Sequence, residues 1–148
     1  MSKRDALPFA VTLEVRDSCL CLHVQRAARA LARRYDEALR PVGLTSGQFS
    51  LLMSLNRPEP PRMGEVADLL AMDRTTLTAN VKPLQRRRLV EVQIDAADRR
   101  GRLLALTPAG RAVLTAAMPA WRQAQAALHR ALGGVDPAVL CDALQAIS

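Results

Sequence analysis

The chain of 148 residues has few of the side chains that enzymes use for chemistry. It has two histidines and three cysteines. The sequence shows no plausible nucleophile–base pair, no glycine-rich phosphate loop and no cluster of metal ligands. These absences argue against a hydrolase, a nucleotide-dependent enzyme or a metalloenzyme. We therefore expect a protein that is not an enzyme and that uses no cofactor or metal.

Long apolar runs are also missing. None approaches the roughly 20 residues that a membrane-spanning helix needs, and the first ten residues lack the apolar core of a signal peptide. Three cysteines are too few for a secreted disulfide framework. We therefore expect a cytoplasmic protein with no membrane partner. Aromatic residues make up only 3% of a chain rich in Ala, Leu and Arg, which favours a mostly helical fold.

The charge is strongly positive. The formal net charge is +7, the isoelectric point is about 10.6, and Lys3 and Lys82 are the only lysines among 21 basic residues. Arginine forks onto phosphates and base edges, so this composition favours a nucleic-acid partner. The 49% hydrophobic content is enough for the core of one domain, or of one lobe with extra helices for pairing.

The sequence pattern in the first third of the chain predicts a loose arm at residues 1–16, followed by one long helix. Ser18 is the expected cap of this helix. Apolar residues follow at three-to-four spacing from Leu20 to Val42, and Pro41 and Gly43 mark the helix end.

Three helices come next, and the last two are in helix-turn-helix order. Thr45 and Gln48 form a capping-box pattern for a helix that precedes the proline-rich loop at residues 57–61. A short helix at 63–70 is expected to bury Val66, Leu69 and Leu70. After a turn at residues 71–72, Asp73 caps the helix that matters most for function.

The helix capped by Asp73 has two different faces. Leu77, Val81 and Leu84 fall within one narrow arc and must face the core. The opposite arc carries small or cationic residues that suit the major groove of DNA. An ordinary solvated face is the alternative. The arc holds Thr75, Ala79, Lys82 and Arg86, with Thr76 and Thr78 on its shoulders. Pro83 should bend this helix or open its turn.

A β-hairpin follows this helix. Val90, Val92 and Ile94 alternate with polar residues, as Leu104 and Leu106 do on the return strand. The hairpin tip carries Arg99, Arg100 and Arg102. Arginines at such a tip suit a narrow minor groove. Asp98 is expected to hold the Arg100 side chain in one orientation. The alternative is a charged turn that prevents edge-to-edge aggregation.

Two helices complete the chain. Thr107 and Pro108 predict a helix start, and this helix should run to about Leu132 with a kink at Pro119. Asp136 and Pro137 start a last helix ending near Ile147. Cys141 is expected in the core on the apolar side of that last helix.

These patterns resemble the MarR family of bacterial regulators from about Leu20 to Leu132. The matching segments, in order, are LTSGQFSLLMSL, MGEVADLLAMDRTTLTANVKPLQRRRLV and DAADRRGRLLALTPAG. The last segment is similar to the family's wing signature, which falls on Asp98, Arg100, Leu104, Leu106, Thr107 and Gly110. Three such motifs in the family order are a specific signal.

The resemblance implies a mainly α fold with a small β-hairpin wing, that is, a winged helix-turn-helix with N- and C-terminal dimerisation helices. We divide the chain accordingly into an arm and dimerisation helix at 1–44, a DNA-binding lobe at 45–107 and C-terminal dimerisation helices at 108–148. The implied partners are a second copy of the chain and double-stranded DNA with a palindromic operator. Recognition helices would enter successive major grooves, and wings would enter the flanking minor grooves.

The family's DNA contacts carry over to Arg74, Thr75, Thr76 and Thr78 in the recognition helix and to Arg100 in the wing, with Arg99 as a neighbour. Two positions depart from the family pattern. Arg88 stands where a glycine is usual, so it would need a left-handed backbone. Ala79 stands where a bulky or basic residue is common, so base preference does not carry over.

The resemblance also implies a switch, either a small aromatic acid or oxidation of a cysteine. An Arg beside apolar groups suits an aromatic carboxylate; the candidate pocket residues are His23, Arg26, Phe49, Met53 and Trp121. Cys19 and Cys21 flank the expected start of the first helix, where a thiol is more reactive. Buried structural cysteines, a redox or electrophile sensor and a thiolate metal site remain three open interpretations.

The sequence thus predicts a homodimeric, sequence-specific DNA-binding repressor released by a small aromatic ligand. A thiol- or metal-responsive repressor using Cys19 and Cys21 is the alternative. A winged-helix module that binds protein is a further rival, but it would carry an apolar outward face on the second helix, where Thr75, Ala79, Lys82 and Arg86 stand instead.

Overall fold

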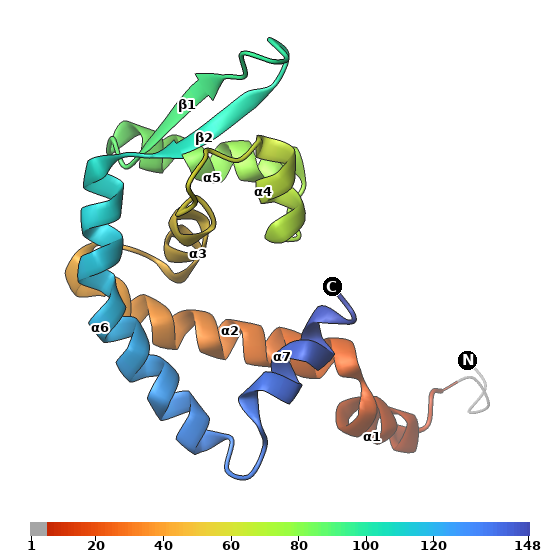
Figure 1. Cartoon of the computed structure of the whole chain (residues 1–148). Coiled ribbons are helices and arrows are strands. Elements are labelled where there is room, and N and C mark those ends of the chain that lie inside the picture. Colours follow the sequence, from red (N-terminus) through yellow and green to blue (C-terminus); the bar gives the residue numbers. More distant parts are fainter. Residues whose placement is uncertain (1–5) are drawn as a thin grey trace.

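The computed structural model describes residues 6–148, and its fold is mainly α with one β-hairpin (Figure 1). The elements follow one another as α1 (Phe9–Ser18), α2 (Leu20–Leu39), a 3-10 turn η1 (Arg40–Val42), α3 (Ser46–Ser54), α4 (Met63–Leu69), α5 (Arg74–Arg86), β1 (Val90–Ile94), β2 (Arg102–Leu106), α6 (Pro108–Ala131) and α7 (Pro137–Gln145). This is the element order of the winged helix-turn-helix, so the predicted fold class is confirmed.

The molecule has two parts. Helices α3, α4 and α5 and the hairpin form a lobe, while α2 and α6 pack on each other below it (Figure 1). Tyr35 on α2 donates a hydrogen bond from its hydroxyl to the side-chain oxygen of Gln125 on α6. The long helices therefore form a shaft that carries the lobe.

Local capping explains where several elements begin. Thr45 Oγ1 accepts from the Gln48 amide at 3.1 Å, and the Gln48 side chain accepts from the Thr45 amide at 3.1 Å. Thr107 Oγ1 accepts from the Gly110 amide at 3.0 Å, with Pro108 in the first turn of α6. The reciprocal pair at Thr45 and the single bond at Thr107 satisfy amides that a helix start leaves unpaired, and both predicted starts are confirmed.

The core fills the lobe and extends to the ends of α2 and α6 that meet it. Leu39, Leu52, Leu77, Leu84 and Leu104 are fully buried there. Each such side chain contributes about 1.5–3 kcal/mol by leaving water. Because Leu77 and Leu84 come from α5, the core fixes the rotation of that helix about its axis.

The expected arm at residues 1–16 is wrong for the part that the structure describes. Residues 9–18 form α1, and Ser18 is its last residue, with its hydroxyl bonded to the Glu14 carbonyl at 2.6 Å. Cys19, in extended backbone, caps α2 in place of Ser18. Helix α1 buries no residue in the single chain, so it lacks the one-sided apolar stripe that periodicity detects. Residues 1–5 lie outside the described part.

Three burial predictions are also wrong. Leu69 is 60% exposed, because the inner face of α4 is formed by Val66 and Ala67. Ile94 is 62% exposed at the outer end of its strand. Cys141 is exposed, because α7 lies against the outside of the single chain and none of its residues is buried.

Within residues 6–148, no helix is both long and apolar enough to cross a bilayer.

Candidate nucleic-acid interface

Helix α5 presents the predicted polar face to solvent. Leu77, Val81 and Leu84 are buried beneath it. The residues of the opposite face and its shoulders are all exposed: Thr75, Thr76, Thr78, Ala79, Lys82 and Arg86. Arg74, the first residue of the helix, is exposed as well. The helix also continues through Pro83 to Arg86. The burial of α5 therefore agrees with both predicted faces.

Asp73 holds the first turn of α5. Its Oδ1 accepts from the Thr76 amide at 2.7 Å, and its Oδ2 accepts from the Thr76 hydroxyl at 3.0 Å. These bonds, the backbone bond first, lower the pKa of the Asp73 carboxyl. The Thr78 hydroxyl donates to the Arg74 carbonyl at 2.8 Å. The hydroxyl groups of Thr76 and Thr78 thus donate their hydrogen bonds within the helix. Their oxygen lone pairs and methyl groups remain available to a partner.

Arg74 lies in the angle between α4 and α5. A Cβ built on Gly64 would stand 2.8 Å from a guanidinium nitrogen of Arg74. The absence of a side chain at Gly64 therefore lets the guanidinium rest against the first turn of α4. This placement brings a cation next to the start of both helices of the helix-turn-helix.

The end of α5 is tied to both long helices. The Arg87 guanidinium donates to the Gly43 carbonyl at 2.8 Å, and the Thr107 hydroxyl donates to the Arg88 carbonyl at 2.7 Å. Arg88 has a φ of 57°, so the left-handed conformation expected in place of the usual glycine is confirmed.

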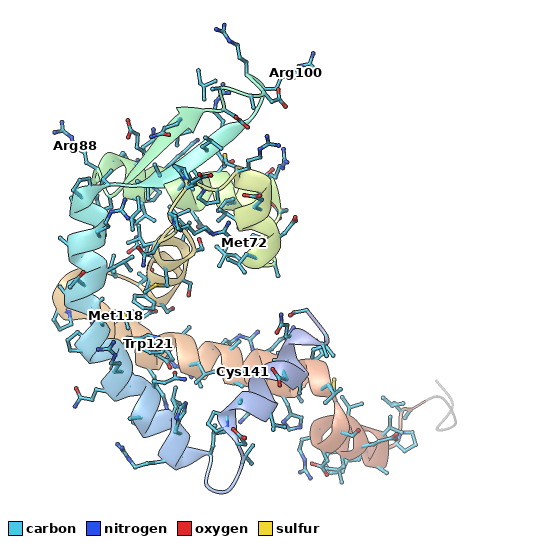
Figure 2. The ribbon with its side chains drawn as sticks, viewed as in Figure 1. Met72, Arg88, Arg100, Met118, Trp121 and Cys141 are labelled. Carbon is cyan, nitrogen blue, oxygen red and sulfur yellow. The ribbon has the colours of Figure 1, made fainter. Side chains whose placement is uncertain are left out.

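The wing is an antiparallel hairpin with Val90 opposite Leu106 and Ile94 opposite Arg102. Figure 2 shows Arg100 projecting from its tip, away from the rest of the molecule. Arg102 instead folds back, and its guanidinium donates to the carbonyls of Arg99 and Gly101 at 3.1 Å each. Arg100 and the exposed Arg99 therefore form the outermost positive charge, and Arg102 stiffens the turn.

The carboxylate of Asp98 has a different hydrogen-bond partner from the one expected. Asp98 Oδ1 accepts from the backbone amide of Arg100 at 3.1 Å, whereas the sequence suggested a contact with the Arg100 side chain. This bond commits Asp98 Oδ1 to the backbone of the turn, while the Arg100 side chain projects away from the tip. Asp95, directly after the outer end of β1, is buried and pairs with Arg62 at 2.9 Å.

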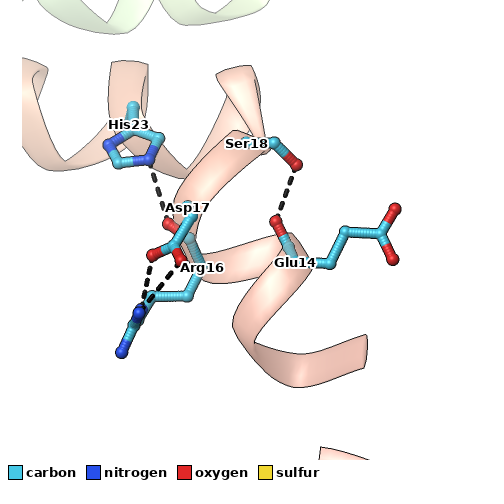
Figure 3. Close-up of polar contacts among 5 residues, drawn as sticks. All are labelled: Glu14, Arg16, Asp17, Ser18 and His23. Carbon is cyan, nitrogen blue, oxygen red and sulfur yellow. Dashed lines mark hydrogen bonds and ion pairs between the residues drawn. The ribbon is translucent and has the colours of Figure 1, made fainter. Parts of the chain in front are cut away.

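The predicted effector residues fall into two groups. Phe49 and Trp121 stack with ring centroids 6.2 Å apart, and Met53 lies beside the same core. His23 instead lies at the junction of α1 and α2, where its Nε2 contacts the Arg16 carbonyl at 3.0 Å (Figure 3). Arg26 is exposed on α2. The single chain therefore does not bring the five residues into one pocket.

A shallow apolar groove lies between α2, α3 and α4, and the sequence did not predict it. Its volume is about 370 Å³, and its lining includes Leu31, Tyr35, Ser46, Ser50, Leu70 and Met72. In the sequence, Tyr35 belongs to the apolar face expected between Leu20 and Val42, and Met72 belongs to the expected turn at residues 71–72, so neither pattern indicates a groove.

The cysteines are accessible. Cys19 is partly exposed, Cys21 is exposed, and both are free thiols. In the described residues, no three His, Cys, Asp or Glu side chains gather closely enough to hold a metal ion. Since Cys19 precedes α2 in extended backbone, the two thiols do not have the fixed angular separation of residues on one helix.

Comparisons with known proteins agree with this geometry. Residues 42–101 match the model of the MarR family. The chain is 35% identical over 121 residues to the HTH-type transcriptional repressor NicR of Pseudomonas putida KT2440, covering 80% of this chain and 72% of NicR.

Two solved structures are similar over most of the chain. One is the Mycobacterium tuberculosis transcriptional regulator MosR in complex with DNA, with 41% identity, a TM-score of 0.77 and coverage of 86% of this chain and 92% of MosR. The other is Bordetella bronchiseptica BpsR, whose DNA binding is regulated by 6-hydroxynicotinic acid, with 26% identity, a TM-score of 0.70 and coverage of 86% and 89%. The chain therefore belongs to the MarR family and is a DNA-binding transcriptional regulator of the winged helix-turn-helix type.

Proposed function

We propose that this regulator is a homodimeric repressor that binds a palindromic operator. The observation that carries the proposal is the exposed face of α5, with small residues at its start and cations at its end, beside a wing whose Arg100 points outward. A helix with this face fits the major groove, and an arginine at a hairpin tip fits the minor groove. The relative NicR is itself a repressor.

The dimer part of the proposal rests on apolar surface far from the DNA-binding lobe. Large apolar residues on or beside α1, α2 and α7 are exposed in the single chain: Leu7, Phe9, Val15, Leu20, Val139, Leu144 and Ile147. Apolar surface of this kind marks a protein interface. A second copy covering the same helices would place two α5 helices on one side of the DNA duplex, as a palindrome requires.

The proposed effector is a small aromatic acid. The groove between α2, α3 and α4 joins the shaft to the lobe, so an occupant would change the distance between them. Leu31, Leu70 and Met72 offer apolar contacts for a ring, and Ser46 and Ser50 offer polar ones. BpsR, a relative of similar fold, responds to a compound of this class. A coupling of about 1–3 kcal/mol would change operator affinity five- to 150-fold.

A thiol switch is the second candidate, and the exposure of Cys19 and Cys21 favours it. Peroxide would oxidise the two thiols to a disulfide: each sulfur loses a proton and an electron, one S–S bond forms, and the peroxide is reduced to two waters. The extended backbone at Cys19 separates α1 from α2, and Cys21 is the second residue of α2, so a bond between them would distort the start of α2 beside this break.

A gel-shift experiment with the DNA upstream of the protein's own gene tests both switches. We expect a shifted band that 6-hydroxynicotinate or benzoate weakens, and a dimer mass by analytical ultracentrifugation. Peroxide should weaken the band only if the thiols act, and the Cys19→Ser, Cys21→Ser double variant should then resist it. Binding as a monomer, or no preference for operator over random DNA, would refute the proposal.

A further inference from the structure

We propose that Arg62 is a positioning residue for the wing, acting through its ion pair with Asp95 at the junction of β1 and the turn. The proposal rests on the wing contact proposed above for Arg100. Arg62 lies at the cap position of α4, 33 residues before Asp95 in sequence, and one of its guanidinium nitrogens is 2.9 Å from Asp95 Oδ2. The pair joins the helix-turn-helix to the hairpin.

Asp95 is built into the hinge between β1 and the turn. Its side chain is only 10% exposed, its Oδ1 accepts from the Ala97 amide at 2.9 Å, and its own amide donates to the Gly101 carbonyl at 3.2 Å. The turn therefore closes around this carboxylate. A buried carboxylate needs partners for each oxygen, and Arg62 is the cation that partners Oδ2.

Arg62 is itself held from the α4 side. Its amide donates to Glu65 Oε2 at 3.0 Å, and its backbone forms a β-bridge with Leu103 of β2. The adjoining Pro61 carbonyl accepts from the Leu104 amide at 2.9 Å. The segment before α4 thus runs along the outer edge of the wing, and the Arg62–Asp95 pair clamps its end to the base of the tip.

This arrangement sets the direction in which the tip arginines leave the lobe. Asp95 and Gly101 close the turn that carries Arg99 and Arg100, and a Cβ at Gly101 would meet the Asp95 side chain at 3.3 Å. Without Arg62 the Asp95 carboxylate would move toward water, and the turn would move with it. The wing would still fold, but Arg100 would no longer be held in the orientation that fits the minor groove.

The direction in which Asp95→Asn changes DNA affinity distinguishes this positioning role from a general electrostatic effect. Asp95→Asn removes a negative charge near the DNA, so general electrostatics predicts tighter binding. Loss of the ion pair predicts weaker binding, because the wing loses its fixed direction. Arg57→Met is a matched control, since Arg57 lines the same surface hollow as Arg62 and Asp95, and its contact with Glu65 is long at 3.9 Å.

The experiment measures operator affinity and its salt dependence for the full chain with each substitution, after circular dichroism has shown that each variant is folded. We expect Arg62→Met and Asp95→Asn each to weaken binding about threefold or more. We also expect Arg62→Lys to restore part of the loss and Arg57→Met to have a smaller effect than Arg62→Met. Combined with Arg100→Ala, either substitution at the pair should add little further loss, because the wing contact is already gone.

Two results would overturn the proposal while leaving the proposed function intact. One is tighter binding by Asp95→Asn, and the other is a fully additive loss in the Arg62→Met, Arg100→Ala double variant, which would indicate that Arg62 contacts the DNA itself. Failure of the proposed wing contact shows differently, because Arg100→Ala alone would then leave the affinity and the salt dependence unchanged.

Discussion

Arg87 and Gly43 are 44 residues apart in sequence, and the Arg87 guanidinium donates a 2.8 Å hydrogen bond to the Gly43 carbonyl. Gly43 has a φ of 72° and ends the segment that follows α2, while Arg87 caps the end of α5. The bond therefore links the segment after α2 to the end of α5, the proposed recognition helix. A carbonyl in a left-handed turn and a guanidinium at a helix end both gain a partner.

We expect Arg87→Ala to lower the free energy of unfolding by about 1 kcal/mol, as is typical for one exposed hydrogen bond. Urea unfolding followed by circular dichroism measures this change. Arg86→Ala serves as the control, because it removes the neighbouring positive charge and leaves the Gly43 bond in place. Equal destabilisation by the two substitutions would contradict a specific role for the bond.

Gly110 allows the first turn of α6 to lie against the backbone of Leu89, which follows α5. A Cβ at this position would stand 2.3 Å from the Leu89 carbonyl oxygen and 2.7 Å from Leu106. We expect Gly110→Ala to destabilise the fold by about 1–3 kcal/mol, because backbone must move to admit the methyl group.

Gly47 provides the matched control for Gly110. It also lies in a helix, but a Cβ there would meet no atom within 4 Å. We expect Gly47→Ala to raise the free energy of unfolding by about 0.5–1 kcal/mol, because alanine loses less entropy in a helix. Thermal and urea unfolding of both variants test this pair, and destabilisation of similar size at the two sites would contradict it.

The features that depend on near neighbours were predictable from sequence. The caps at Thr45, Asp73 and Thr107 depend on residues within three positions, and the buried face of α5 depends on one helical repeat. The strained Arg88 was also predictable, because the end of a helix at that point requires a left-handed residue whichever side chain occupies it.

The features that depend on distant residues were not predictable. Nothing in the local pattern indicates that Asp95 turns inward to meet Arg62, or that Arg87 reaches Gly43. The exposure of Cys141 has a similar origin, since apolar spacing marks a face but does not say whether the same chain covers it. Tertiary packing determines the Asp95–Arg62 pair and the Arg87–Gly43 bond, and no local pattern encodes either contact.

Asp73 should make stability depend on pH. Hydrogen bonds from Thr76 lower its pKa in the folded chain, so the ionised form stabilises the fold. This contribution is complete above the ordinary pKa of Asp, about 4, and is lost as pH falls through the lowered folded value. We expect the difference in unfolding free energy between the natural chain and Asp73→Asn to shrink below about pH 4. An unchanged difference between neutral and acidic pH would argue against this carboxylate.

Thr75 should govern preference among DNA sequences. It is exposed in the first turn of α5, where a hydroxyl or methyl can meet base edges. We expect Thr75→Ala to change the ranking of operator variants and to leave affinity for random duplex DNA nearly unchanged. Competition binding with single-base operator variants measures this ranking, and Thr115→Ala on α6 controls for the chemical change. An equal loss on operator and random DNA would exclude direct base contact by Thr75.

Arg100 should contribute affinity with little dependence on sequence. It projects from the wing tip, where it can meet phosphates and the minor groove without reading a base pattern (Figure 2). We expect Arg100→Ala to weaken binding to most duplexes alike and to reduce the slope of log affinity against log salt by about one, as for one lost phosphate contact. Arg122→Ala, an exposed charge on α6, should leave the slope unchanged. Titrations at several salt concentrations measure both slopes, and an unaltered slope for Arg100→Ala would place the wing tip away from the DNA.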